Sequence, residues 1–167
     1  LMYGGKGKFE NEIRLSNRGL RGGGDITFSS SLSKGEDFIF FPDSMNGIAK
    51  TFDIKEQGSP DEFPQSHGDK IYIHWMPYND LMNAFDTETP FSTYNKQAEI
   101  RGRYDLSPKE LYGRGKVDFQ RADLIARKIL FKEKKFFSDT ADFHLKAFDE
   151  EGFTFTTDNV NATIDFE

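Results

Sequence analysis

The sequence of 167 residues contains no cysteine, a single tryptophan and only six prolines. Without cysteine the chain cannot form disulfides, use a thiol as a nucleophile or build a cysteine-based zinc site. No apolar run approaches the roughly 20 residues that a membrane-spanning helix needs, so we expect no transmembrane segment. The absence of cysteine leaves the compartment open, because such a chain is compatible with any redox environment.

The chain also lacks an excess of cationic side chains, since its formal net charge is -6 at pH 7. A protein that binds nucleic acid through the phosphates needs a cationic surface. The densest basic stretch, residues 128–135, is interrupted by apolar residues and by Glu133. We therefore interpret this stretch as a solvated strand and turn, and we expect no nucleic-acid partner.

Phenylalanine, by contrast, is abundant, with 18 residues, and apolar residues alternate with polar ones along most of the chain. Residues 71–75, 141–147 and 160–166 show this alternation, which is typical of strands with one buried face. The predicted fold is all-β, either a repetitive β-solenoid or an elongated curved antiparallel sheet. Residues 78–85 are an exception and predict a short helix with Asn79 as its cap.

A ten-residue signature occurs twice, at residues 15–24 and 106–115, with Leu, Ser, a basic residue, Leu and two glycines at matching places. Such a repeat indicates architecture rather than chemistry. It predicts a first β repeat unit over residues 1–56 and a second over residues 98–167, separated by an irregular, aromatic-rich insertion over residues 57–97. We expect one continuous module, and the strand pattern at the C-terminus predicts a fragment of a longer chain.

Neither the glycine clusters nor the histidines form a recognisable site. Residues 4–8 and 22–24 lack the Lys-Ser/Thr pair and the helix that follow a phosphate-binding loop, so we interpret their glycines as backbone corners. His67, His74 and His144 are too far apart in sequence for a local metal motif. The sequence leaves open a metal or acid–base site assembled from distant residues. No catalytic residue, metal or cofactor is predicted.

Three aspartates occupy the same place in related segments: Asp43, Asp139 and Asp158 each precede a Ser, Thr or Asn. An aspartate at the entrance of a strand usually accepts hydrogen bonds from backbone N–H groups in a turn. We therefore expect all three in turns. The sequence selects no pair of carboxylates that could act as those of a glycosidase.

Two groups of aromatic residues are candidate binding surfaces. Alternation places the side chains of the first group on one side of their strands: Phe28, Phe40, Phe119, Phe143, Phe155 and Phe166. We expect them to form either a core or an open apolar groove that holds lipid. The second group lies in the insertion and predicts a contact with a partner, a sugar or a lipid, or a plug over the β core: Trp75, Tyr78, Phe85, Phe91 and Tyr94. The plug is the simpler interpretation, because large aromatic side chains mostly serve packing.

Several stretches carry a resemblance to known proteins: Phe40-Phe41-Pro42-Asp43-Ser44-Met45, Trp75-x-Pro77-x-x-Asp80-x-Met82, Pro90-Phe91-x-x-Tyr94-Asn95, Leu106-Ser107-Pro108 and Ser138-Asp139-Thr140-Ala141-Asp142-Phe143. They resemble a module of very long uncharacterised extracytoplasmic proteins of Bacteroidetes-type bacteria. Residues 113–166 are also similar to OstA-like β-scaffolds, the periplasmic bridge proteins that carry lipopolysaccharide or other lipids between membranes. The resemblance implies a location in the periplasm or at the cell surface.

We therefore expect a non-enzymatic β-scaffold module of a large cell-envelope protein. Its predicted partners are lipid or lipopolysaccharide, bound or conducted along an apolar groove, and neighbouring repeats of the same chain. A structural or adhesive stalk is the alternative, and a carbohydrate-active β-helix enzyme is a third hypothesis that requires two carboxylates in a cleft. A groove open to solvent favours the lipid hypothesis, whereas an enclosed core favours the stalk.

Overall fold

A computed structural model describes residues 1–55, 63–119, 121–146 and 153–163. Apart from two short 3-10 helices, η1 (Tyr3–Gly5) and η2 (Pro77–Asn79), the elements of this part are strands. The strands are β1 (Lys8–Glu10), β2 (Ile13–Ser16), β3 (Gly19–Phe28), β4 (Ser31–Phe40), β5 (Met45–Ile54), β6 (Ser66–Met76), β7 (Leu81–Phe85), β8 (Phe91–Thr93), β9 (Ala98–Leu106), β10 (Leu111–Phe119), β11 (Ala122–Lys132), β12 (Lys135–Leu145) and β13 (Phe153–Thr163). The predicted all-β fold is confirmed.

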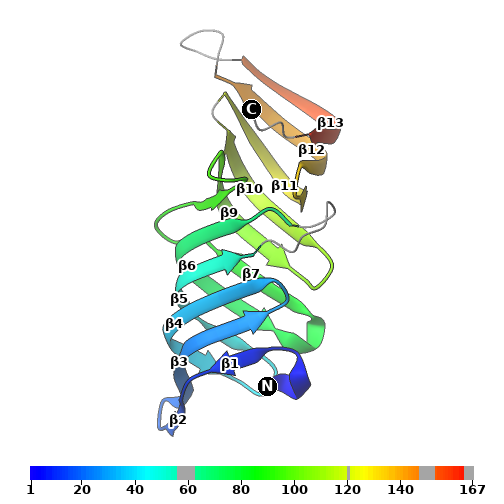
Figure 1. Cartoon of the computed structure of the whole chain (residues 1–167). Helices are drawn as coiled ribbons and strands as arrows, with labels where there is room; N and C mark the ends of the chain where they lie inside the picture. The colour runs from blue at the N-terminus through cyan, green and yellow to red at the C-terminus, as the bar shows by residue number, and fades with distance from the viewer. Residues whose placement is uncertain (56–62, 120, 147–152, 164–167) are drawn as a thin grey trace.

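These strands form one antiparallel sheet in which most strands pair with the next strand along the chain. The order is β1-β3-β4-β5-β6-β7-β9-β10-β11-β12-β13, with β2 beside β3 and with β8 between β6 and β9. Figure 1 shows the sheet extending from β1 and β2 at one end of the molecule to β13 at the other. Of the two predicted architectures, this is the elongated antiparallel sheet.

Two positions in the sheet are each filled by two short strands. β1 pairs with residues 25–27 of β3, and β2 pairs with residues 19–22 of the same strand. β7 and β8 likewise both lie between β6 and β9. The predicted insertion, residues 57–97, therefore contributes β6, β7 and β8 to the sheet.

The short helix predicted over residues 78–85 is wrong beyond Asn79. Only Pro77–Asn79 are helical, and Leu81–Phe85 are strand β7. The physical reason is that β7 is hydrogen-bonded on both sides, to β6 and to β9. Pairing with these two strands outweighs a local pattern that also suits a helix.

Only one of the three aspartates predicted in turns lies in one. Asp43 follows β4 in the connection to β5. Asp139 and Asp158 lie inside β12 and β13, so the prediction is wrong for both. The hairpin between β11 and β12 closes where Lys132 pairs with Lys135, which places Asp139 well inside the following strand.

The two copies of the signature begin in comparable hairpins. Leu15 of β2 pairs with Leu20 of β3, and Leu106 of β9 pairs with Leu111 of β10. The connections differ in length, since β3 starts at Gly19 whereas a longer loop precedes β10. The signature therefore marks a hairpin that leads into a glycine-containing strand.

Both of these strands bend at a glycine bulge. The pairing register shifts between Gly22 and Gly24 in β3, and between Gly113 and Gly115 in β10. Gly24 has φ +155 and Gly115 has φ +129, and a Cβ atom at either position would lie 2.2 Å from a backbone oxygen. Bulges of this kind bend a strand and increase its twist, so these glycines allow the sheet to curve.

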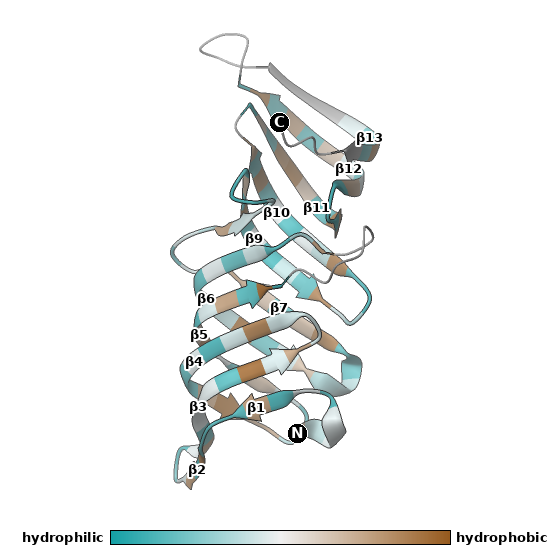
Figure 2. Cartoon of the chain, in the orientation of Figure 1, coloured by the Kyte–Doolittle hydropathy of each residue, from teal (hydrophilic) through white to brown (hydrophobic). Residues whose placement is uncertain are grey.

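Curvature closes the inner face of the sheet over an aromatic core. Phe28 of β3 contacts Trp75 of β6 with ring centroids 5.6 Å apart, although β3 and β6 are not neighbours in the sheet. Further along, Phe91 contacts both Phe52 and Tyr104, at 5.9 and 4.7 Å. All five side chains are at most 2% exposed. Hydrophilic and hydrophobic residues alternate along the strands around this core (Figure 2).

We expect the substitution Phe91→Ala to lower the free energy of unfolding by about 3–5 kcal/mol, because it removes a large side chain from a filled core. The matched control is Ile125→Ala on β11, whose side chain is 53% exposed, and we expect it to change stability by no more than about 0.5 kcal/mol. Urea denaturation followed by fluorescence measures both. Similar small effects of the two substitutions would contradict a closed core.

Candidate functional site

A row of polar side chains crosses the outer face of the sheet, opposite the core. Its members are neighbours from strand to strand in the pairing register: Asp53, His67, Ser92, Glu99, Asp118, Asp123 and His144. We call it the Asp–His row. Alternation predicts a polar side chain at Asp53, Asp118, Asp123 and His144, but only the register places the members of the row beside one another.

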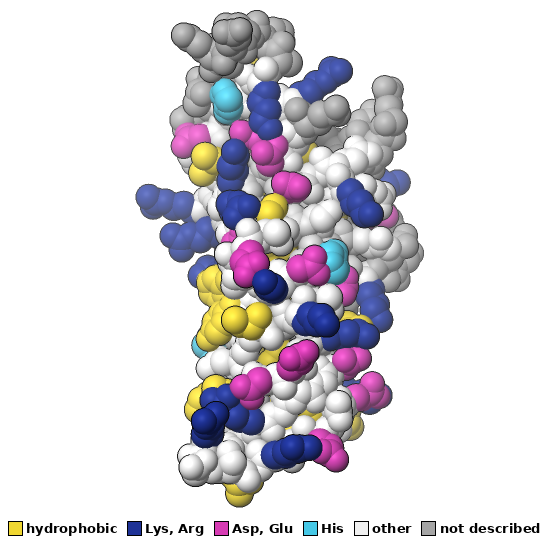
Figure 3. All heavy atoms as spheres, turned by 90° about the vertical axis from the view of Figure 1, so that its left-hand side faces the viewer, with side chains coloured by type: hydrophobic (Ala, Val, Ile, Leu, Met, Phe, Trp, Pro, Cys, Tyr) yellow, Lys and Arg dark blue, Asp and Glu magenta, His cyan; other side chains and the backbone are white. Residues whose placement is uncertain are grey.

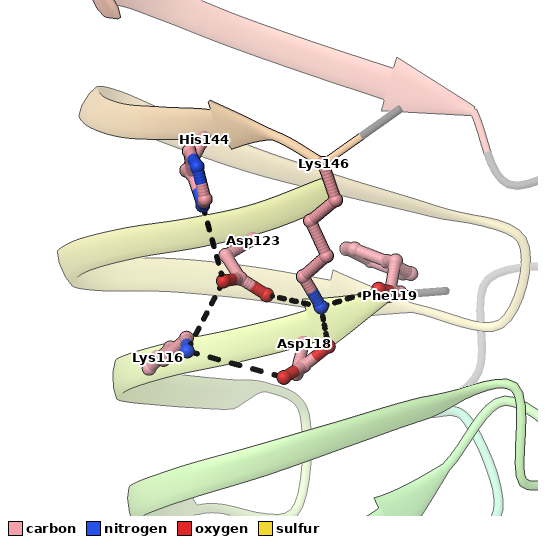
Figure 4. Close-up of polar contacts among 6 residues, drawn as sticks. All are labelled: Lys116, Asp118, Phe119, Asp123, His144 and Lys146. Atoms are coloured by element: carbon pink, nitrogen blue, oxygen red, sulfur yellow. Dashed lines mark hydrogen bonds and ion pairs between the residues drawn. The ribbon is translucent and has the colours of Figure 1, made fainter. Parts of the chain in front are cut away.

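Asp123 is the centre of a cluster of charges at one end of the Asp–His row (Figure 4). Its carboxylate lies 2.8 Å from Nζ of Lys146 and 3.1 Å from Nζ of Lys116. Nδ1 of His144 is 3.6 Å away. Asp118 contacts the same two lysines. The cluster thereby joins β10, β11 and the end of β12.

The charges of this cluster keep one another ionised. Burial by itself would raise the pKa of Asp123, whose side chain is 9% exposed, but the contacts with Lys146 and Lys116 outweigh burial and lower the pKa below 3.8. Hydrogen bonds to Asp118 and Asp123 raise the pKa of Lys146 above 10.5. A carboxylate that stays ionised is a poor proton donor, and an ammonium that keeps its proton is a poor nucleophile. The arrangement suits fastening of strands rather than proton transfer.

A second constellation surrounds His67 further along the Asp–His row. Nδ1 of His67 is 2.6 Å from Oδ1 of Asp53, and Nε2 is 3.2 Å from Oδ1 of Asp69. The hydrogen bond with Asp53, helped by the charge of Asp69, raises the pKa of His67 above 6.5 against the effect of partial burial. A protonated ring that donates both N–H groups fits this geometry, and such a ring has no free nitrogen to act as a base.

Beside His67 lies a hollow of about 720 Å³ at the ends of β5, β6 and β8. It is lined by Asp53, Ile54, Lys55, Gln65, Ser66, His67, Ser92, Asn95 and Lys96. The buried hydroxyl of Ser66 lies 2.9 Å from both Oγ1 of Thr93 and the hydroxyl of Tyr104. Burial raises the pKa of Tyr104 to about 12, so this phenol stays neutral. Ser66 is therefore held by neutral hydroxyls and has no activating base among these partners.

Among the described residues, no group of three or more His, Asp or Glu side chains is arranged to hold a metal ion. Asp53, His67 and Asp69 meet in pairs through hydrogen bonds. His74, on β6, lies on another row of the outer face, where it pairs with Asn46 and Asn83.

The six phenylalanines predicted to form a core or a groove are divided by the structure. Phe28 and Phe40 are buried in the core, with 2% and 5% of each residue exposed. Phe119 and Phe143 are half-buried against the core. The side chain of Phe155 and all of Phe166 lie outside the described residues. The backbone of Phe155 pairs with Phe143. Phe119 stacks on Phe136 with centroids 5.8 Å apart.

The five aromatic residues predicted as a partner contact or a plug are also separated. Trp75, Phe91 and Tyr94 are buried, with exposures of 0%, 0% and 2%. Tyr78 is 59% exposed, and Phe85 is half-buried on the outer face. Three of the five therefore pack in the core, whereas Tyr78 and Phe85 lie outside it.

No family model, curated protein or solved structure matches this chain. In the part of the chain that the structure describes, no helix has the length and hydropathy needed to cross a membrane.

We expect Asp123→Asn to lower the free energy of unfolding by about 1–3 kcal/mol, because it removes the charge that Lys116 and Lys146 share in a largely buried position. The matched control is Glu99→Gln on the same Asp–His row, where the side chain is exposed, and we expect it to stay within about 0.5 kcal/mol. Equal effects in chemical denaturation would show that the cluster adds no stability.

The raised pKa of His67 predicts that its contribution to stability is fully present below pH 6.5 and is lost as the pH rises through the folded-state pKa. We therefore expect the stability difference between the native chain and His67→Gln to shrink with rising pH. An NMR titration of the imidazole checks the cause, since Asp53→Asn should lower the pKa of His67. A pKa at or below 6.5 in the native chain would contradict the interpretation.

Proposed function

We propose that the chain is a non-enzymatic scaffold module that supplies length and a stiff, curved sheet. The observation that supports it best is the aromatic core beneath the sheet. The chain of ring contacts from Phe52 through Phe91 and Tyr104 reaches Phe131 of β11. An interior filled with interlocking side chains resists bending.

The outer face supports the same proposal. Asp123 and His67, the two centres of the Asp–His row, have their charges balanced by neighbours on adjacent strands. Ion pairs of this kind hold neighbouring strands in register. The chemistry available at these positions therefore favours a structural function over a reaction.

In this proposal the module is part of a larger cell-envelope protein in the periplasm or at the cell surface, and neighbouring repeats of the same chain extend it. The resemblance to OstA-like scaffolds and the elongated sheet support this placement (Figure 1). With about 4.8 Å between paired strands, the path from β1 to β13 covers roughly 50 Å of sheet. A structural or adhesive stalk uses such length directly.

A second candidate function, lipid binding, is supported by the end of the sheet near β12. Phe119 and Phe143 are half-buried there, whereas Phe28 and Phe40 are sealed. In this second function an acyl chain contacts the edge of the core at Phe119 and Phe143, because these two side chains retain apolar surface that water reaches.

Native mass spectrometry of the purified chain, before and after incubation with phospholipid and with lipopolysaccharide, tests the two functions. A scaffold remains free of lipid, and its radius of gyration by X-ray scattering exceeds the roughly 15 Å of a compact chain of this length. The scaffold proposal would be overturned in favour of lipid binding if the native chain carries stoichiometric lipid. In that case Phe143→Ser should lose the lipid, and the control Phe137→Ser on the same strand should keep it. A compact radius of gyration would also contradict the scaffold.

A further inference from the structure

A second hollow, of about 330 Å³, lies across β10, β11, β12 and β13, at the end of the sheet opposite to β1 and β2 (Figure 1). Apolar and polar side chains line it together: Tyr112, Lys128, Leu130, Phe137, Ser138, Asp139, Asn159, Val160 and Asn161. We call it the Tyr112 hollow. Its volume lies at the lower end of the roughly 300–1,000 Å³ that small-molecule sites occupy, so it has room for a small ligand.

The apolar part of the Tyr112 hollow is a row of side chains on the outer face of the sheet. Successive strands contribute neighbours in the pairing register: Tyr112, Leu130, Phe137 and Asn161. The residues that precede the first three in sequence are buried in the core: Leu111, Ile129 and Phe136. Because neighbouring residues of a strand point to opposite faces, the row faces away from the core. Two aromatic rings and a leucine are therefore half-buried on the side of the sheet where alternation favours polar residues.

An ammonium group lies over each of the two aromatic rings. Nζ of Lys128 is 4.4 Å from the centroid of the Tyr112 ring, and Nζ of Lys135 is 5.5 Å from the centroid of the Phe137 ring. The negative faces of the rings already attract these two cations. A cationic ligand would be repelled by the same ammonium groups, so the rings do not form a site for a cation.

Carboxylates border the same place. Asp139 lines the Tyr112 hollow, and both Asp139 and Glu110 lie close enough to Tyr112 to act on its phenol. Burial is the main cause that raises the pKa of Tyr112 above 10.0, and the two carboxylates add to it, so the phenol stays neutral. The same carboxylates would repel an anionic ligand. Figure 3 shows Lys and Arg side chains standing among Asp and Glu side chains along one side of the molecule, so the outer face is not dominated by one sign of charge.

The polar groups of the Tyr112 hollow are available to a ligand. Within the described part of the chain, the side chains of Asp139, Asn159 and Asn161 are exposed and make no hydrogen bond or ion pair. Each amide offers two donors and an acceptor, and the carboxylate offers acceptors only. A ligand rich in hydroxyl groups matches this mixture, because a hydroxyl both donates and accepts.

We propose that the Tyr112 hollow binds a neutral saccharide. The C–H groups on one face of a pyranose ring pack against Tyr112 and Phe137, and the hydroxyl groups at its rim bond to Asp139 and Asn161. The balanced charges around the rings favour such a ligand over a cation or an anion. The inference is independent of the proposed scaffold function. It is also separate from the lipid candidate, because neither of the phenylalanines proposed to contact an acyl chain lines the Tyr112 hollow.

The shallow build of the site sets the strength of binding. The Tyr112 hollow is small and open to solvent, so it covers only part of a sugar, and its exposed side chains lose freedom when they bind. We therefore expect a dissociation constant on the order of 0.1–1 mM for a disaccharide.

Saturation-transfer NMR tests the site with neutral disaccharides of hexoses and N-acetylhexosamines, beside uronic-acid disaccharides of the same size. None of these probes carries an acyl chain, so the result does not depend on lipid binding. We expect at least one neutral disaccharide to bind, and to bind about tenfold more tightly than its uronic-acid counterpart. Titration of the backbone amide signals gives the dissociation constant and shows whether β10 to β13 respond.

Substitutions locate the site, with circular dichroism as a check of folding in each variant. Tyr112→Ala should weaken binding about fivefold to tenfold, because it removes one ring, whereas Tyr112→Phe should retain most of the affinity. Asn161→Ala should weaken binding about fivefold through the loss of a hydrogen bond. The matched control is Tyr72→Ala, which removes a ring from β6 that is 38% exposed on the same face, and it should bind as the native chain does.

Three results would overturn the proposal. A native chain that binds none of the neutral disaccharides has no such site. Binding of uronic-acid disaccharides alone would make the Tyr112 hollow a site for anions. Affinity that is unchanged in both Tyr112→Ala and Asn161→Ala would place the sugar elsewhere. If Tyr112→Ala fails to fold, Asn161→Ala decides alone, because Asn161 is exposed on the last strand of the sheet.

Discussion

The packing of β3 and β4 over β6 and β7 across the inner face is the constraint on which the rest of the structure depends. Phe28 reaches Trp75 of β6, and Oγ of Ser31 lies 3.8 Å from Sδ of Met82 in β7, although neither pair of strands is hydrogen-bonded. Burial of this apolar surface is the main favourable term that holds a sheet in a closed curve. A flat sheet of the same order would leave these side chains in water.

This curvature also determines the outer face. Ile48 of β5 and Tyr72 of β6 are neighbours in the pairing register, and both stay exposed on this face. Away from the bend, Asp123 is enclosed by lysines of the adjacent strands. The outer face therefore differs in chemistry from place to place, since Asp123 is held by ion pairs whereas Ile48 and Tyr72 are exposed apolar side chains.

The sequence alone was sufficient for the all-β class and, in the alternating segments that it identified, for the side that faces the core, because alternation is a local property. Ile71, Ile73 and Trp75 are buried as their alternation predicts. Local pattern failed for residues 81–85 and for Asp139, where pairing with other strands decided the conformation. It also could not align His67 with Asp53, because a shift of one residue in register would place every side chain on the opposite face.

The repeated signature illustrates the same division. The glycines of residues 22–24 were interpreted as a backbone corner, and Gly24 has a positive φ that glycine tolerates, as does Gly115 in the second copy.

By itself, then, the sequence determined that this protein is a sheet with an aromatic inner face, a polar outer face and glycine corners, because each of these follows from neighbouring residues. Only the tertiary structure decided that the inner face is closed around Trp75 and Phe91, that Asp123 gathers two lysines, and that Ile48 and Tyr72 form an exposed row. The physical reason is that burial and ion pairing depend on which strands meet, and that depends on register and curvature across the whole sheet.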